Sequence, residues 1–210
     1  MSIITWPIDL VPGAGTGWGQ RRYDGTLESD ITGARQDILL GPPRWTLSIQ
    51  QPPDLDIVTA GRWQALVMQL RGRVNHLLAW DFGRPAPLGT WRGTMSLGAS
   101  MAIGATTIQI ASDASQAGRT LLPGDKLQIG TGLGTSQVVM VVSEATASGA
   151  GAGTIAIEPP ARIALGSGTP VIWQRASAYF KAANSSQSWQ YSEGSLFSSG
   201  LAIDLVEVWT

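Results

Sequence analysis

Three glycines at alternate positions, Gly130, Gly132 and Gly134, form the first feature of the sequence whose spacing suggests chemistry. Glycine-rich loops bind phosphate when their backbone N–H groups face the ligand at the start of a helix. Here the glycines lead into TSQVVMVV, a strongly strand-forming stretch, and Lys126 precedes them on what would be the opposite strand. The sequence therefore predicts a β-hairpin connection at this loop and no phosphate site.

Metal or nucleophilic chemistry would have to involve His76, the only histidine of the chain, because there are no cysteines. His76 stands beside Leu77 and Leu78 in a segment that favours a strand. One imidazole with scattered carboxylates is a weak ligand set for zinc or iron. Asp81 is close in sequence, but no serine stands in a G-x-S-x-G turn. We therefore interpret His76 as structural and predict no metal and no cofactor.

Paired carboxylates on a shared cleft could support glycoside hydrolysis. In the middle of the chain three of the four acids fall in predicted turns, where a carboxylate serves turn geometry or faces solvent. These four are Asp113, Asp125, Glu144 and Glu158. A second group lies in a stretch of low hydrophobicity, interpreted as a solvated loop, and comprises Asp24, Glu28, Asp30 and Asp37. The sequence thus predicts no catalytic residues, and we do not expect an enzyme.

The nine tryptophans are many for 210 residues and are compatible with stacking platforms for sugars or single-stranded nucleic acid. Trp45 and Trp63 follow the apolar periodicity of their segments and Trp80 lies in a predicted strand, so we expect these three in the core. For the other six tryptophans the sequence does not distinguish a core position from an anchor in a subunit contact. These are Trp6, Trp18, Trp91, Trp173, Trp189 and Trp209.

The low content of charged residues limits the kinds of partner that this chain is expected to bind. Charged residues make up 14% of the chain, against roughly 25% in typical soluble domains, as is common where other subunits cover the surface. The formal net charge is −1 and the basic residues form no dense run, so non-specific binding to nucleic acid is not supported. No apolar run approaches the roughly 18 residues of a membrane span, and the first residues do not resemble a signal peptide.

Outside the middle of the chain, apolar periodicity predicts one helix and several strands. The helix is expected at about residues 59–71, with Thr59 as N-cap and Gly72 just after its end. Strands are predicted at residues 3–10, interrupted by Pro7, and at 44–50, 74–83 and 201–205. The glycine-rich stretch VPGAGTGWGQ between the first two strands is predicted to be a flexible connector.

Residues 93–172 have a different texture, with one aromatic at most, many small residues and no long helical pattern. Turn residues separate five short predicted strands, which indicates a small β-barrel or sandwich. These strands are Thr107–Ala111, Lys126–Ile129, Gln137–Val142, Thr154–Ile157 and Val171–Trp173.

The two ends of the chain are both rich in aromatic residues and resemble each other more than either resembles the middle. We therefore predict a mainly β (α+β) fold with a discontinuous domain formed by residues 1–92 and 175–210. A small β-barrel domain, residues 93–174, is inserted into it. Such an insertion needs its entry and exit to lie close together, which adjacent strands would supply.

The order of several short motifs resembles the minor tail proteins of long-tailed bacteriophages, and most closely the distal tail proteins. The resemblance covers nearly the whole chain in layout, although each motif is short and degenerate. The motifs are WP at the start, RWTLSIQQPP, LRGRVNHLLAWDFGRPAPLGTWRG, LLPGDKLQIG, TIAIEPPAR and a final LAIDLVEVW.

This resemblance implies a β-sandwich domain with one helix that assembles into a hexameric ring, decorated by an inserted OB-like or galectin-like barrel. Such a ring belongs to the virion tail, assembled in the bacterial host cytoplasm, and joins the tail tube to the tail tip or baseplate. Its implied partners are identical subunits, the tail-tube protein and the tail hub or tip protein, with the tape-measure protein as a further candidate. DNA passes through the lumen without specific binding, and no membrane insertion is implied.

Two other functions remain as alternatives. In one, the inserted barrel is a host-attachment module that binds cell-surface carbohydrate, although residues 93–172 offer almost no aromatic platform for a sugar. In the other, the chain is the tail-tube subunit, which stacks into long tubes. Closed rings have a physical advantage for a β protein of low surface charge, because cyclic contacts cover sheet edges that would otherwise pair without control.

Overall fold

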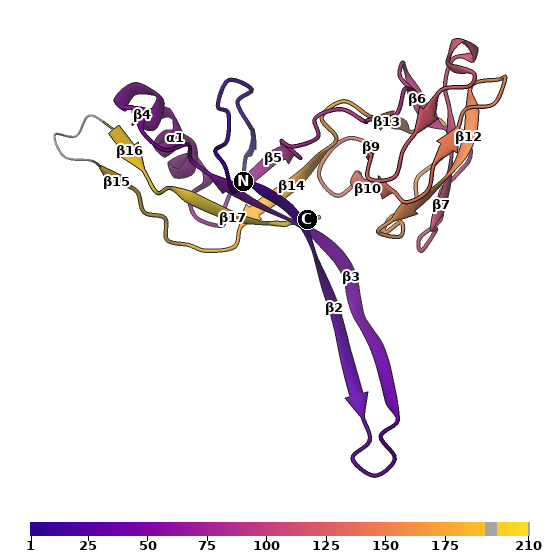
Figure 1. The fold of residues 1–210 in the computed structure, drawn as a ribbon, viewed down its shortest axis with the longest axis horizontal. Helices are drawn as coiled ribbons and strands as arrows, with labels where there is room; N and C mark the ends of the chain where they lie inside the picture. Colours follow the sequence, from indigo (N-terminus) through magenta and orange to yellow (C-terminus); the bar gives the residue numbers. More distant parts are fainter. Residues whose placement is uncertain (192–196, 210) are drawn as a thin grey trace.

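The computed structural model describes residues 1–191 and 197–209, and it confirms a mainly β fold with a closed six-stranded barrel. A six-stranded sheet with a helix lies at one end of the molecule, and the barrel lies at the other (Figure 1). A long β-hairpin projects from between them (Figure 1).

The six-stranded sheet is built from both ends of the chain. Its strand order is β1 (Ile3–Thr5), β5 (His76–Trp80), β14 (Ser177–Ala182), β17 (Ala202–Glu207), β3 (Arg35–Gln50) and β2 (Gly17–Glu28). Only the β1–β5 pair is parallel. Because β14 and β17 lie between β5 and β3, the sheet cannot be completed without the C-terminal residues. The first strand is shorter than the predicted 3–10, since the chain turns after Thr5 and Pro7 lies outside it.

The single α-helix of the described residues is α1 (Ile57–Leu70). Its apolar residues recur at helical spacing, and the buried ones are Ala60, Trp63, Leu66, Val67 and Leu70. The prediction of Thr59 as N-cap was wrong. Asp56 is the cap, and its carboxylate accepts hydrogen bonds from the backbone N–H groups of Val58 and Thr59. At the other end Arg71 takes the left-handed conformation, followed by Gly72 at positive φ.

The Asp56 cap should make part of the stability depend on pH. Hydrogen bonds from the Thr59 side chain and backbone hold the pKa of Asp56 below its usual value. A lowered folded-state pKa contributes stability above the unfolded-state pKa, and this contribution is lost as pH falls through the folded-state value. We expect Asp56→Ala to lower the urea midpoint at pH 7, with the difference from wild type shrinking at pH 2–3. Asp56→Asn is the control, since asparagine caps equally well. An Asp56→Ala effect that stays constant with pH would contradict this origin.

The middle of the chain forms the closed barrel. Its strands, in barrel order, are β10 (Gln137–Val141), β12 (Ala152–Glu158), β7 (Thr107–Ala111), β6 (Met95–Leu97), β13 (Pro170–Ile172) and β9 (Lys126–Ile129). All five predicted strands are present, within two residues at their ends. The sequence analysis missed β6, because its three residues, which follow Gly93-Thr94 and precede Gly98, give too short an alternation to recognise.

Short elements complete the secondary structure of the described residues. The 3-10 helix η1 (Ala114–Gln116) follows β7 in sequence, and β8 (Thr120–Leu121) pairs with β11 (Ala145–Thr146). A small three-stranded sheet has the order β15 (Gln190–Tyr191), β16 (Phe197–Ser199) and β4 (Leu55–Asp56).

Two buried hydrophobic clusters form the interior. One lies between α1 and the six-stranded sheet, and the other fills the barrel. Trp45, Trp63 and Trp80 are in the first cluster, as predicted. Among the tryptophans left open, Trp6 joins the same cluster and Trp91 the barrel cluster; both are buried and therefore serve as core residues.

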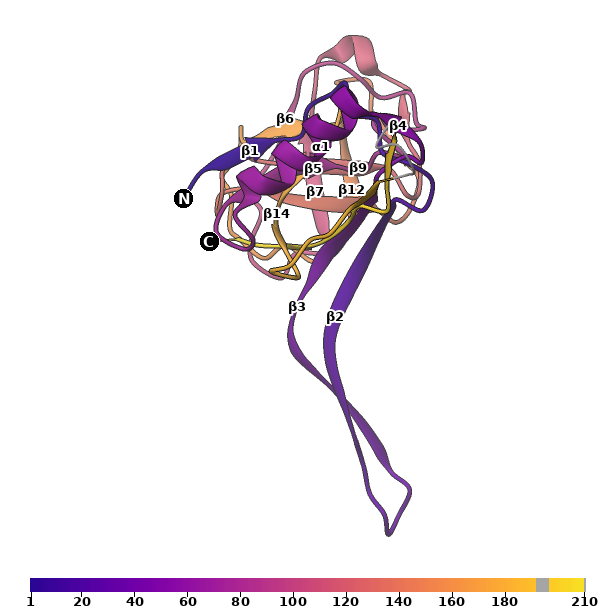
Figure 2. The same cartoon turned by 90° about the vertical axis from the view of Figure 1, so that its left-hand side faces the viewer.

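The stretch of residues 17–50 departs most from the sequence analysis. The expected flexible connector ends at Gly17, where β2 begins, and the expected solvated loop is a paired antiparallel hairpin. The acids Asp24 and Glu28 lie on β2 and Asp37 on β3, with Asp30 in the turn between the strands. Figure 2 shows the hairpin extending away from the body in a second view. The sequence analysis did not predict this hairpin because it is polar: neither face of its distal half is buried against the molecule, so the usual alternation of apolar residues is missing.

Candidate functional site

The residues considered for chemistry do not form a common site. His76 is buried in β5, where its backbone N–H donates to the Ser2 carbonyl at 3.0 Å. Asp125 is also buried and accepts backbone hydrogen bonds from Leu88, Gly89 and Leu122. Asp113 caps η1. Across residues 1–191 and 197–209, no group of three or more acidic or histidine side chains is placed to hold a metal ion.

The glycine-rich loop connects β9 to β10, which are antiparallel neighbours in the barrel, so the hairpin prediction is confirmed. Its carbonyl oxygens are bound within the loop: Thr135 Oγ1 donates to Thr131 O and Ser136 Oγ donates to Gly132 O. Gly130 has a φ of 78°, and a Cβ there would lie 2.3 Å from the Thr135 carbonyl oxygen. Glycine is therefore required by the turn itself.

The projecting hairpin, β2 with β3, is the most prominent candidate for an interaction surface. Its pairing runs from Gly17–Ser48 at the base to Glu28–Arg35 at the far end. The register shifts near Tyr23, opposite the Gly41-Pro42-Pro43 segment, because proline cannot donate to a strand ladder. Beyond this irregularity lies the distal half of the hairpin, residues 23–41. A free two-stranded ribbon is marginally stable in water, so this half is suited to being covered by a partner.

Large apolar side chains are exposed on this distal half. Ile31 at the turn is 95% exposed and Leu40 is 71% exposed, and Leu27 and Leu39 are exposed as well. Scattered exposed apolar residues are ordinary, but four on one narrow ribbon with open strand edges indicate a contact surface. The signal that could have identified it is weak: Tyr23 and Leu27 stand four residues apart in RYDGTLES, on one face of an extended strand, and RQDILLG ends in a short apolar run.

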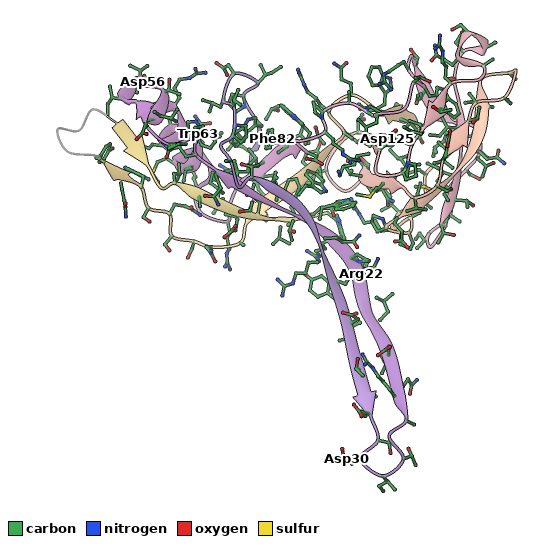
Figure 3. The ribbon with its side chains drawn as sticks, viewed as in Figure 1. Arg22, Asp30, Asp56, Trp63, Phe82 and Asp125 are labelled. Carbon is green, nitrogen blue, oxygen red and sulfur yellow. The ribbon has the colours of Figure 1, made fainter. Side chains whose placement is uncertain are left out.

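Charge divides the hairpin into two parts. The distal half holds four acidic side chains against one basic, and the acids are Asp24, Glu28, Asp30 and Asp37. The base instead carries Arg21, Arg22 and Arg44, of which Arg21 and Arg44 lie over the Tyr23 ring at 5.2 and 6.0 Å. The hairpin is therefore acidic toward its tip and basic where it leaves the body. Figure 3 shows Arg22 at the base and Asp30 at the far end.

An open cavity of about 460 Å³ lies between the hairpin base and the barrel; we call it the base groove. Leu39 and Leu40 line it from the hairpin, and Ile103 lines it from the barrel. Its charged side chains are Arg22, Glu158 and Arg162. Arg22 and Glu158 approach to 3.9 Å across the groove, and both are substantially exposed.

Buried polar contacts hold the barrel against the sheet beside this groove. Arg162 of the barrel donates to Glu207 of β17 at 2.8 Å, and its guanidinium stacks on Trp209 at 4.6 Å. Burial lowers the pKa of Arg162, while the Glu207 charge raises it. Lys126 of β9 donates to Asp81 at 2.5 Å, and the Trp45 indole N–H donates to the Val138 carbonyl. The hairpin base, β17 and the barrel are thus linked by direct contacts.

Comparison of the sequence with protein-family models and with curated proteins gave no match. No helix within the described ranges is long and apolar enough to cross a membrane. The geometry of the hairpin and its base groove therefore carries the functional argument.

Proposed function

We propose that the chain is a structural protein of a phage tail, without enzymatic activity. It forms a hexameric ring that joins the tail tube to the tail tip or baseplate and leaves an open channel for DNA. In this proposal residues 1–92 and 175–210 are the ring-forming β-sandwich domain, and residues 93–174 are a barrel on the outside of the ring.

The observation that carries the proposal is the projecting hairpin. At its far end Leu27 and Ile31 are exposed on a ribbon with open strand edges, at a distance from its own body, so only another molecule can cover them. The proposed ring requires this contact to be heterologous, so that each copy gives its hairpin to one neighbour and receives a hairpin from the other. Heterologous contacts between identical subunits generate closed rings when the rotation closes.

Two further observations support a structural assembly protein over a carbohydrate-binding module. The low charge content suits a molecule whose surface is largely covered by neighbours. The two tryptophans of the barrel cluster are poor sugar platforms, because Trp91 is buried and Trp173 lies under Arg92 at 4.9 Å. A carbohydrate-binding barrel is therefore less well supported than a structural one.

The solution mass of the purified chain tests the proposal. Light scattering should give a species near six times the 22.1 kDa of one chain, or 132.6 kDa, and negative-stain images of that peak should show particles with an open centre. Long tubes would favour the tail-tube subunit instead. A 22.1 kDa species at every concentration would contradict the ring.

A variant of the hairpin tip tests the observation behind the proposal. Leu27→Asp together with Ile31→Asp should shift the mass to the monomer and leave the thermal midpoint of the monomer unchanged, because both side chains are exposed. Leu88→Asp, an equally apolar and exposed position away from the hairpin, is the matched control and should leave the oligomer intact. Unchanged assembly of the tip variant would exclude the hairpin as the ring contact.

A further inference from the structure

We infer that the base groove is the receptor for the hairpin tip of a neighbouring copy of this chain. The inference rests on the proposed function and adds to it the two surfaces that meet. The tip comprises Leu27 to Ile31, and the receptor is the groove lined by Leu39, Leu40 and Ile103 with Arg21 and Arg22 beside it.

The apolar parts of the two surfaces match. The groove is open and its apolar walls come from both the hairpin and the barrel, so it can take side chains that enter from outside. The tip offers Leu27 and Ile31, both exposed in the single chain. Seating them between Leu40 and Ile103 would remove four exposed apolar side chains from water together, which favours association.

The charges match in sign. The tip carries Glu28 and Asp30. The groove and the neighbouring polar cavity are lined by more basic than acidic side chains, namely Arg21, Arg22, Arg44 and Arg162 against Asp24 and Glu158. An acidic tip on a basic base is attractive, whereas two tips or two bases would repel. This pattern favours a tip-to-base contact over tip-to-tip and base-to-base contacts, and the solution mass separates a ring from two copies that exchange tips reciprocally. It also predicts that the association weakens as salt increases, because these charges are exposed.

A chain cannot fill its own groove. Gly41 at the groove lies six residue steps along β3 from Arg35 at the end of the hairpin pairing, which corresponds to roughly 20 Å of extended strand. The two views agree that the hairpin points away from the barrel (Figures 1 and 2). The receptor is therefore available to a second copy, and the same contact can repeat around a ring.

Charge reversal tests the pairing. Glu28→Arg with Asp30→Arg should raise the dissociation constant of the oligomer by at least about tenfold in sedimentation at low salt, as should Arg21→Glu with Arg22→Glu. The four substitutions combined in one chain should restore assembly, which loss of folding could not do. Glu144→Arg, an exposed barrel position, is the control. If wild type assembles and neither reversal weakens it, this inference is overturned while the ring stands. If the wild-type chain never assembles, both this inference and the proposed ring fail.

A cysteine pair tests proximity, because the natural chain has no cysteines. Ile31→Cys with Ile103→Cys should form a ladder of disulfide-linked chains on a non-reducing gel under mild oxidation. Ile31→Cys with Val74→Cys places the second thiol at an exposed site outside the groove and should form far fewer cross-links. Equal cross-linking of the two pairs would overturn the inference.

Discussion

Replacing Glu207 with alanine is expected to lower the free energy of unfolding by about 3–5 kcal/mol, because it leaves a buried guanidinium without its partner. The Glu207 side chain is 2% exposed and the Arg162 side chain 11% exposed, and their N–O distance is 2.8 Å. The other carboxylate oxygen of Glu207 accepts the backbone N–H of Trp45 at 3.0 Å. The substitution therefore removes partners from both the barrel and the sheet. Urea denaturation followed by tryptophan fluorescence measures the change.

A double substitution separates the cost of an orphaned charge from the value of the pair. Arg162→Met with Glu207→Leu should be much less destabilising than Glu207→Ala alone, since a buried pair and apolar residues of similar volume are often close in stability. Asp37→Ala, which breaks the exposed Arg35–Asp37 pair, should change stability by less than about 1 kcal/mol. If Glu207→Ala lowers the free energy of unfolding by no more than Asp37→Ala does, the Arg162–Glu207 pair does not stabilise the contact between barrel and sheet.

Replacing Trp63 with alanine is expected to destabilise the chain by about 3–5 kcal/mol, the range for removing a large aromatic side chain from a core. Trp63 is 1% exposed and lies on α1, facing the six-stranded sheet. Its ring packs edge-on against Trp6 at 5.2 Å, and Trp6 in turn packs against Phe82 at 5.1 Å. Figure 3 labels Trp63 and Phe82. A cavity at this position would loosen the helix from the sheet.

The control for this prediction lies on the same helix. Met68 is exposed, so Met68→Ala should change the free energy of unfolding by less than about 0.5 kcal/mol. Because typical domains are stable by about 5–15 kcal/mol, Trp63→Ala should still fold in the cold but should unfold at a much lower temperature. A Trp63→Ala chain as stable as Met68→Ala would mean that α1 does not depend on this contact.

The stability of the junction between barrel and sheet, where Arg162 contacts Glu207, matters for the proposed ring because of its position. Arg162 lines the base groove and also holds Glu207, whose strand β17 pairs with β3 of the hairpin. The groove and the hairpin that we infer to meet between copies are thus fixed relative to each other within one copy. A loosened junction would change the angle between them, and a ring needs the same angle in every subunit to close.

Local pattern was sufficient for the regular parts of this protein. Five of the six barrel strands are runs of three to seven strand-forming residues between turn residues, and the helix places its buried residues at a period of 3.6, so these elements follow from residue type and spacing alone. The glycine loop was read correctly because strand-forming residues on both sides leave only a turn between them. Thr59 was misassigned as the N-cap because Asp56, three residues earlier, offers the same cap chemistry and the sequence does not show which one ends the extended chain.

The sequence by itself determined the mainly β composition, the helix with its buried face and most barrel strands. Only the tertiary structure decided the order in which strands from both chain ends interleave, the projection of β2 and β3, and the groove at their base. Strand order depends on contacts between residues far apart in sequence, which local periodicity does not encode. The hairpin also lacks a buried face in the single chain, so the apolar alternation by which strands are recognised is weak where the contact with another copy is proposed.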